Sequence, residues 1–298
     1  MGNIILLNSA INAIKNLPSV TIDLMLPAAF EPLMRDIRVD NIISIEKRAY
    51  ITRPWKLISL LRSLRKTGYD LAIDCSDVNS LSLTGAVYTL LSGSKRTAGW
   101  RMDANRVFDI EVPRYDNTIH AGEMYLRLIS GVFNQRLDGE PYFPDTPAAL
   151  VNTIPIVGIN CGGRGPKKWD LENFLQIGNM LSVKGIKTEF ILGPDEEESR
   201  SFLEKHLPKR GALIPLTQIA DLKDLFCRYA AFVSSDTGPM HLAWSLRIPT
   251  VAIFIDSEIE KFKPLSSGSV ALDARDGVDL QTVFDHVTRI IKTREVPA

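Results

Sequence analysis

The sequence alternates short, almost purely apolar runs with segments of helical periodicity, and this alternation constrains the fold more than any other feature. The runs expected to form strands are 22–26, 42–45, 71–75, 156–160, 188–192 and 232–235. Helical spacing occurs at 55–66, 81–91, 171–181, 197–206, 222–229 and 280–292. Strands that are apolar on both faces are typical of parallel sheets covered by helices on both sides. The sequence therefore predicts an α/β fold with doubly wound parallel sheets in both halves.

The beginning of the chain departs from this alternation. Ile4, Leu7, Ile11 and Ile14 recur at the spacing of one helix face. We therefore expect a helix here, so that the N-terminal sheet lacks a strand ahead of its first helix.

A Pro-rich and acidic stretch at 138–147 separates the two halves. Such composition is typical of linkers between domains. We expect an N-terminal domain over residues 1–148 and a C-terminal domain over residues 149–298. A chain of 298 residues with 45% apolar residues has enough material for two cores.

Composition also excludes several classes of protein. No apolar run approaches the roughly 20 residues that cross a bilayer, and no secretory leader is recognisable. Cys75, Cys161 and Cys227 are far apart, which fits reduced thiols, and neither an Asp-x-Asp motif nor a His cluster is present. We expect a cytoplasmic protein without a metal or cofactor and without nucleic acid as a partner.

Residues 47–106 hold a surplus of positive charge, with 11 basic residues against four aspartates. The first interpretation is that these side chains only keep helix faces and loops solvated. The second interpretation is that they form a face that binds an anionic acceptor or a membrane surface, with Arg96 and Arg101 on the acceptor face. The basic residues are Lys47, Arg48, Arg53, Lys56, Arg62, Arg65, Lys66, Lys95, Arg96, Arg101 and Arg106.

The strongest motif spans residues 231–254 and predicts a strand, a tight polar turn, a helix and another strand. Thr237 or Gly238 can cap the helix, and Pro239 can occupy its first position. Backbone amides and the positive helix end would then face one spot suited to phosphate, with His241 in the first turn. Capping turns also occur without any ligand, so a purely structural role stays open.

Two further turns follow predicted strands. The turn at 162–169 is rich in glycine and lysine, which permits close backbone approach to an anion, although glycine turns and Trp169 also occur for packing alone. The turn at 193–198 is acidic. Its glutamates either favour the dipole of the next helix or accept hydrogen bonds from ribose hydroxyls.

These motifs resemble glycosyltransferase family 9, the ADP-heptose:lipopolysaccharide heptosyltransferases. The resemblance rests on Ser-Asp-Thr-Gly-Pro-Met-His at 235–241, Lys-x-Trp at 167–169 and Gly-x-x-x-Glu at 193–197, and less specifically on 69–74 and 98–100. It covers essentially the whole chain. It implies a GT-B architecture of two Rossmann-like doubly wound domains facing a cleft, with the last helix, 280–292, packing back on the N-terminal domain.

The resemblance implies that the C-terminal domain binds a nucleotide sugar, with an ADP-linked donor. Lys167 matches the lysine that contacts the donor phosphate or ribose and has a catalytic role, while Gly163 lies in the turn beside it. Glu197 matches the glutamate on the ribose, and the backbone at Thr217 would lie against adenine.

The remaining donor contacts come from the strongest motif. Thr237 and Gly238 match the residues that bind the diphosphate through backbone amides, Asp236 shapes the turn, and His241 lies nearby. The resemblance implies an inverting, metal-independent transfer of a heptose or related sugar to a lipopolysaccharide core or similar glycan, at the inner face of the inner membrane.

Two positions depart from the family pattern. Asn3 stands where the family has the aspartate expected to deprotonate the acceptor, and asparagine cannot accept that proton. Ile255 follows Phe254 where the family usually has glycine. Two alternatives therefore stay open beside the transferase: a catalytically impaired nucleotide-sugar-binding protein and a nucleotide-sugar epimerase of the same fold.

Overall fold

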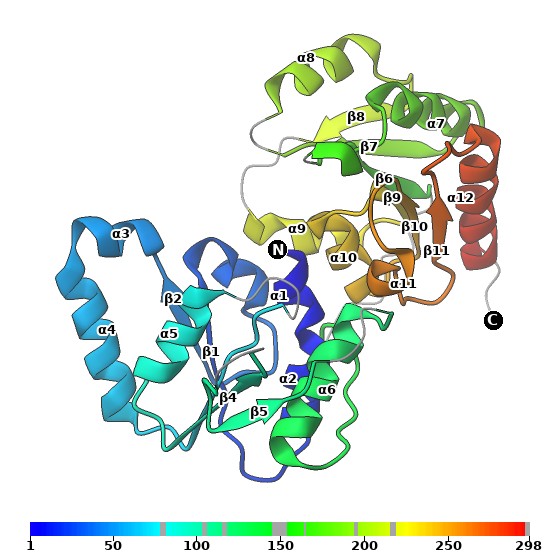
Figure 1. Cartoon of the computed structure of the whole chain (residues 1–298). Helices are drawn as coiled ribbons and strands as arrows, with labels where there is room; N and C mark the ends of the chain where they lie inside the picture. Colours follow the sequence, from blue (N-terminus) through cyan, green and yellow to red (C-terminus); the bar gives the residue numbers. More distant parts are fainter. Residues whose placement is uncertain are drawn as a thin grey trace. The chain divides into compact units, whose positions relative to one another are not determined.

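The computed structural model (Figure 1) describes residues 1–77, 82–102, 106–114, 118–144, 154–163, 165–193, 196–214 and 219–295. The chain divides into two compact units. The C-terminal unit comprises Met1–Ile5, Pro32–Asp36 and Tyr142–Ala298, and the N-terminal unit comprises Leu6–Glu31 and Ile37–Pro141. The change of unit after Pro141 falls inside the predicted linker stretch. The first five residues, however, belong to the C-terminal unit.

The N-terminal unit holds two small parallel sheets. β1 (Asp23–Pro27) pairs with β2 (Asn41–Ile45), and β4 (Arg96–Trp100) pairs with both β3 (Leu71–Ile73) and β5 (Ile110–Val112). The helices of this part of the chain are α1 (Gly2–Leu6), α2 (Asn8–Lys15), α3 (Lys47–Thr52), α4 (Pro54–Thr67), α5 (Leu83–Leu91) and α6 (Ala121–Phe133), with a 3-10 segment at Ala28–Met34.

The helical beginning predicted from periodicity is confirmed, because residues 2–15 form α1 and α2 and no strand precedes β1. In α2, Ile11 and Ala13 are buried, and the helix packs on α6, where the Ser9 hydroxyl donates to the Gly122 carbonyl at 2.9 Å. Gly139 passes so close to α2 that a Cβ there would lie 2.0 Å from the Ser9 carbonyl oxygen. Only glycine fits this approach.

The C-terminal unit is built on one six-stranded parallel sheet with the order β11-β10-β9-β6-β7-β8. Its strands are β6 (Ile156–Asn160), β7 (Lys187–Ile191), β8 (Gly211–Ile214), β9 (Ala231–Ser235), β10 (Thr250–Phe254) and β11 (Val270–Asp273). Its helices are α7 (Leu171–Val183), α8 (Glu197–His206), α9 (Leu222–Cys227), α10 (Gly238–Ser245), α11 (Ile259–Phe262) and α12 (Leu280–Glu295), with 3-10 turns at Gly165–Lys167 and Ile219–Asp221.

The order of this sheet places a topological switch between β6 and β9. The chain leaves β6 toward β7 and β8 on one side, then returns to add β9, β10 and β11 on the other. Doubly wound sheets bind ligands outside the carboxyl ends of the strands at such a point. The doubly wound prediction is thus confirmed for the C-terminal unit, and the switch point marks the expected position of a site.

The last helix packs within the C-terminal unit. Val283, Val287 and Ile291 of α12 are at most 4% exposed and belong to the core of the C-terminal unit, where the helix packs on α7, β9 and β10. This apolar face covers the sheet of its own unit, as expected for the single apolar stripe of an amphipathic helix. The expected packing of the last helix back on the N-terminal domain stays a prediction.

Several elements were not foreseen in the sequence: α3, α6, β5, β8 and β11. The strands among them are three or four residues long and only partly buried, so their apolar pattern is short and interrupted. By contrast, the predictions at 156–160 and 197–206 match β6 and α8 at both ends.

Candidate functional site

The loops after β6 and β9 meet at the switch point through the side chain of Asn160, which is 2% exposed. Its amide nitrogen lies 3.0 Å from the Ser234 hydroxyl, 3.1 Å from the Thr237 hydroxyl and 3.1 Å from the Gly162 carbonyl oxygen. Asn160 therefore fixes the glycine turn against the turn that begins α10. The sequence analysis missed this residue, although a buried polar residue ending an apolar strand is a usable signal.

The turn between β9 and α10 has the geometry of a helix start. Thr237 is the N-cap, in extended conformation, and Gly238 and Pro239 are the first two helical residues. The Thr237 hydroxyl contacts Asn160 and Ser234 and makes no side-chain capping bond. Because the first amides of a helix have no partner within it, α10 directs hydrogen-bond donors and its positive end out of the sheet edge.

Asp236 forms the charged centre of this turn. Its side chain is 6% exposed, with the Lys167 ammonium 3.1 Å from Oδ2 and the His241 Nε2 atom 3.4 Å from Oδ1. Burial alone would raise the pKa of Asp236, but the hydrogen bond from His241 and the charge of Lys167 outweigh it and lower the pKa to about 2. The carboxylate is therefore charged at neutral pH.

The orientation of His241 follows from a second contact. The indole nitrogen of Trp244 lies 3.3 Å from His241 Nδ1, and an indole N–H can only donate. Nδ1 must then be the acceptor, which leaves the proton of the neutral ring on Nε2, facing Asp236. Both ring nitrogens are thus engaged within the protein. Trp244 is a further site residue that the sequence analysis missed.

A second cluster surrounds Glu196, at the ends of β6 and β7. Its carboxylate accepts hydrogen bonds from the amides of Gly193 at 2.7 Å and Gly163 at 3.3 Å, and from the Lys168 ammonium at 3.1 Å. A Cβ on Gly162 would lie 2.5 Å from Glu196 Oε2, so a larger residue here would displace that carboxylate. The amide of Gly163, a residue of the turn expected to approach an anion, is bonded to Glu196 in this structure.

The adjacent Glu197 behaves differently. Its side chain is 80% exposed, at the start of α8, with the Arg200 guanidinium 3.6 Å away. Glu196 is thus tied into the fold while Glu197 points to solvent. The other residue expected at the nucleoside, Thr217, lies outside the described residues.

The start of the chain lies against the same turn, within the C-terminal unit. A Cβ on Gly2 would lie 2.9 Å from the His241 ring, and a Cβ on Gly238 would lie 2.6 Å from the Met1 side chain. Asn3, at the expected position of the base, is exposed and follows directly. The structure therefore brings Asn3 into the neighbourhood of Gly238 and His241, although it precedes both by more than 230 residues in the sequence.

The proposed acceptor residues are less concentrated. Arg96 opens β4 and Arg101 follows its last residue, and both are exposed. Five steps along a strand span about 16 Å, so the two side chains lie at opposite ends of β4 rather than at one point.

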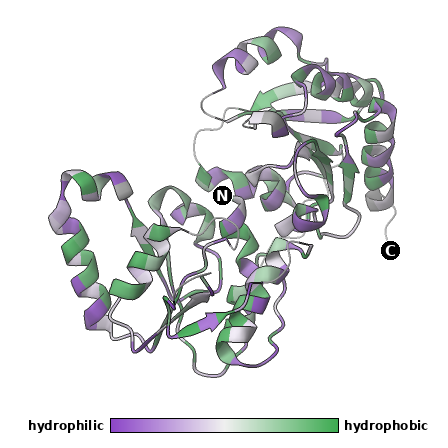
Figure 2. Cartoon of the chain, in the orientation of Figure 1, coloured by the Kyte–Doolittle hydropathy of each residue, from purple (hydrophilic) through white to green (hydrophobic). Residues whose placement is uncertain are grey.

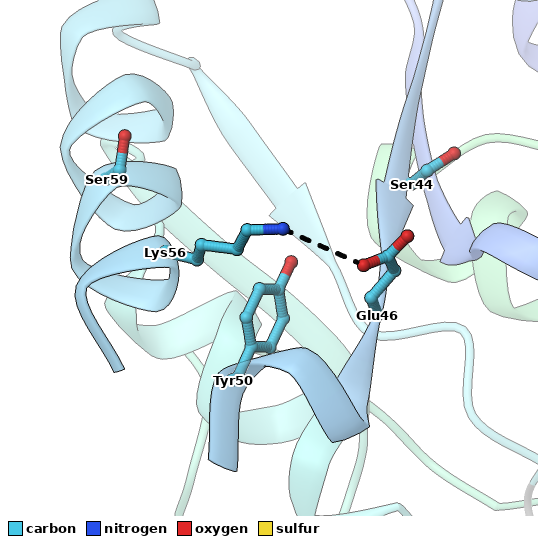
Figure 3. A pocket seen from close by; sticks show the side chains of 5 residues that line it. All are labelled: Ser44, Glu46, Tyr50, Lys56 and Ser59. Atoms are coloured by element: carbon cyan, nitrogen blue, oxygen red, sulfur yellow. Dashed lines mark ion pairs between the residues drawn. The ribbon is translucent and has the colours of Figure 1, made fainter. Parts of the chain in front are cut away.

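A hollow of about 310 Å³ lies elsewhere in the N-terminal unit, at the end of β2 (Figure 3). It is lined by Ser44, Glu46, Tyr50, Lys56 and Ser59, and Lys56 reaches across it to within 4.0 Å of Glu46. Only Lys56 among these residues was noted in the sequence, as part of the basic surplus. The hollow offers hydroxyl, carboxylate and ammonium groups suited to a polar ligand.

The residues that the structure describes form neither a metal-binding cluster nor a membrane-spanning helix. No group of three or more His, Cys, Asp or Glu side chains there could hold a metal ion. Within the same ranges, every helix is too short or too polar to span a bilayer.

Residues 57–278 match the family described as glycosyltransferase family 9 (heptosyltransferase). Lipooligosaccharide heptosyltransferase 2 of Haemophilus influenzae is 25% identical over 136 residues, which span 43% of this chain and 39% of that protein.

Solved structures share the α/β fold with parallel sheets of GT-B heptosyltransferases. A family 9 glycosyltransferase of Veillonella parvula has a TM-score of 0.80 at 20% identity, with 98% of this chain and 94% of that one covered. ADP-heptose lps heptosyltransferase II of E. coli gives 0.78 at 20% identity, covering 98% and 96%. The E. coli heptosyltransferase WaaC with ADP gives 0.76 at 16% identity, covering 97% and 96%.

Proposed function

Because the chain belongs to glycosyltransferase family 9, we propose that it transfers a heptose or related sugar from a nucleotide diphosphate to a lipopolysaccharide core or similar glycan. The observation that carries this proposal is the Lys167–Asp236–His241 cluster at the first turn of α10, at the switch point of the sheet. An amide-rich helix start beside a lysine is suited to a diphosphate.

The donor would be held at this turn. Amides at Thr237 and Gly238 bind the diphosphate, and Lys167, whose side chain is 42% exposed, can move from Asp236 to a phosphate oxygen. The exposed Glu197 accepts the ribose hydroxyls, and the backbone at Thr217 lies against adenine. An ADP-linked donor is supported by the fold shared with a heptosyltransferase solved with ADP. Gly163 acts indirectly, by holding Glu196.

The proposed chemistry is inverting and needs no metal. As the bond between sugar and diphosphate breaks, negative charge grows on the leaving phosphate. The amides of α10, its helix dipole and Lys167 stabilise this charge. His241 is a positioning residue for Asp236, because both of its ring nitrogens are already bonded.

Asn3 favours a second candidate, a nucleotide-sugar-binding protein with impaired turnover. Asparagine cannot take the acceptor proton, yet its place beside the His241 turn suits a base. Replacing Asn3 with Asp tests this: a rise in transfer by a factor of about 100 or more would mark Asn3 as the reason for low activity. An unchanged rate would mean that another group serves as base.

The acceptor is proposed to be an anionic glycolipid or glycan at the inner face of the inner membrane. Arg96 and Arg101 supply exposed positive charge in the N-terminal unit. Neutralising both should weaken acceptor binding and leave nucleotide affinity unchanged. Equal loss of both affinities would contradict this division of roles.

The test of the whole proposal is calorimetric titration with ADP and UDP, beside a transfer assay with ADP-heptose and a lipid A-core acceptor. We expect ADP to bind, and Lys167→Met to lower transfer by roughly 100-fold or more. Lys184→Met removes the same charge from the exposed end of α7 and should leave transfer unchanged. Failure of both nucleotides to bind would refute the proposed donor site, and isomerisation of a UDP-sugar without transfer would favour an epimerase.

A further inference from the structure

The surface formed by α3 and α4 in the N-terminal unit presents side chains that a folded domain usually buries. Ile51 is 83% exposed, Trp55 63% and Ile58 49%. Among the 14 residues of α4, Leu64 alone is fully buried. A group of large exposed apolar side chains commonly marks an interaction surface.

The same segment carries charge of one sign. Residues 47–67 contain seven basic residues and no acidic residue. The nearest carboxylate in sequence, Glu46, pairs with Lys56 at 4.0 Å and offsets one positive charge. The rest of the surplus attracts a negatively charged partner. The basic residues are Lys47, Arg48, Arg53, Lys56, Arg62, Arg65 and Lys66.

The exposed apolar and basic side chains share one face of α4. Residues three, seven and eleven positions apart on a helix lie on the same side, so Trp55 is in line with Ile58, Arg62 and Lys66. All four are exposed. Figure 2 shows green hydrophobic and purple hydrophilic residues interspersed along α3 and α4. The opposite face consists of the buried or half-buried Leu57, Leu60, Leu61 and Leu64.

A neighbouring helix adds to the apolar surface of this unit. In α5, Leu83 is 78% exposed, Val87 49% and Leu90 47%, at the spacing of one helix face. The loop after α5 touches α4, because a Cβ on Gly93 would lie 2.5 Å from the Arg65 side chain. The exposed apolar residues of α3 and α4 are therefore not isolated on this unit.

We propose that α3 and α4 dock on the surface of a lipid bilayer with anionic headgroups. Ile51, Trp55 and Ile58 would enter the headgroup region, where tryptophan is favoured, and Arg62 and Lys66 would contact lipid phosphates. A nucleic acid would use the positive charge but not the aliphatic side chains. The docking itself does not depend on the proposed function. Only its biological role, access to a membrane-bound acceptor, rests on that function.

Trp55 provides a direct optical test. The other three tryptophans, Trp100, Trp169 and Trp244, are at most 6% exposed, so a change in solvent contact reports on Trp55. The full chain is titrated with phosphatidylcholine vesicles that contain or lack phosphatidylglycerol. We expect a shift of emission to shorter wavelength and protection from iodide quenching only with phosphatidylglycerol. An unchanged spectrum with both kinds of vesicle would overturn the proposal.

Vesicle sedimentation with matched variants locates the surface. The double change Arg62→Ser with Lys66→Ser should weaken binding to phosphatidylglycerol vesicles by about 10-fold or more. Ile51→Ser should weaken it several-fold. The controls are Lys184→Ser with Lys205→Ser for charge and Val183→Ser for an apolar side chain that is 87% exposed, and none should change binding. Equal losses in variants and controls would refute docking through α3 and α4.

Two readouts keep this result separate from the proposed function. Vesicle binding requires no transfer, so a chain without activity can still confirm docking. If the chain is active, the α3–α4 variants should lose transfer to acceptor in vesicles but keep transfer to a soluble, lipid-free acceptor. All altered side chains are exposed, so thermal unfolding should be unchanged. Binding to duplex DNA in preference to vesicles would overturn the lipid assignment.

Discussion

Helices α12 and α4 are both amphipathic, yet they use their apolar side chains in different ways. In α12, Val283, Val287 and Ile291 are at most 4% exposed and fill the core of the C-terminal unit. In α4, Trp55 and Ile58 remain 63% and 49% exposed. The same residue types therefore stabilise the fold in one helix and are available for outside contacts in the other.

Charged pairs show the same contrast. The Lys167–Asp236 and Lys95–Asp70 pairs have similar nitrogen-to-oxygen distances, 3.1 and 2.7 Å. The Asp236 side chain is 6% exposed, while that of Asp70 is 86% exposed. Because water screens an exposed pair, burial rather than distance decides what such a contact contributes.

The largest expected difference in stability is between the replacement of a buried isoleucine in α12 and that of a half-exposed isoleucine in α4. Ile291→Ala should lower the free energy of unfolding by about 3 kcal/mol, because it leaves a cavity in the core. Ile58→Ala should cost less than about 1 kcal/mol, since that side chain is half exposed. Urea unfolding of both variants measures the difference. Similar losses would show that α4 is packed as tightly as α12.

The next contrast removes an aspartate from each ion pair. Asp236→Ala should cost about 2–3 kcal/mol, since His241 and Lys167 lose a buried acceptor. Asp70→Ala should cost at most about 0.5 kcal/mol. The same urea experiment applies, with ADP titration of the folded variants as a second readout. A stable Asp236→Ala protein would mean that its site relaxes without cost.

The pH dependence of stability tests the contribution of the buried Asp236 carboxylate. The pKa of Asp236 is lowered from its ordinary value of 3.8 to about 2, so folding gains stability above the unfolded pKa and loses it as pH falls toward 2. Urea unfolding at a series of pH values should show a decrease of about 2 kcal/mol in the free energy of unfolding of the wild type. This decrease should be absent in Asp236→Asn.

An exposed carboxylate provides the control for this series. Hydrogen bonds from Arg275 also lower the pKa of the exposed Asp273 to about 2. Added salt should reduce the contribution of Asp273 to the pH dependence of stability, whereas the contribution of Asp236 should persist. Equal salt dependence for the two residues would contradict the role assigned to burial.

The smallest expected effect concerns a threonine hydroxyl. Thr237→Val removes the contacts of Oγ1 with Asn160 at 3.1 Å and Ser234 at 3.0 Å, and should cost about 1 kcal/mol. Thr67→Val, at the exposed end of α4, removes a 3.1 Å bond to the Ser63 carbonyl and should be nearly neutral. Thermal unfolding of the two variants separates these values.

Local patterns in the sequence determined much of the C-terminal unit. The apolar run at 156–160 and the helical spacing at 197–206 correspond to β6 and α8, because fully buried strands and regular helices impose a period on their residues. The strand–turn–helix motif at 231–245 likewise fixed β9, the cap at Thr237 and α10. Such signals depend on neighbours within one or two turns of chain.

Only the tertiary structure decided which distant residues meet. Lys167 pairs with Asp236 across 69 positions, and Glu196 rather than Glu197 is the glutamate that the glycine turns enclose. The first contact depends on β6 and β9 being neighbours, and the second depends on β6 and β7 being neighbours. Strand order arises from crossovers through the whole sheet rather than from local periodicity. The exposure of Trp55 has the same origin. The sequence showed an amphipathic α4 with a basic surplus, but which of its faces stays in solvent depends on the packing of the whole unit.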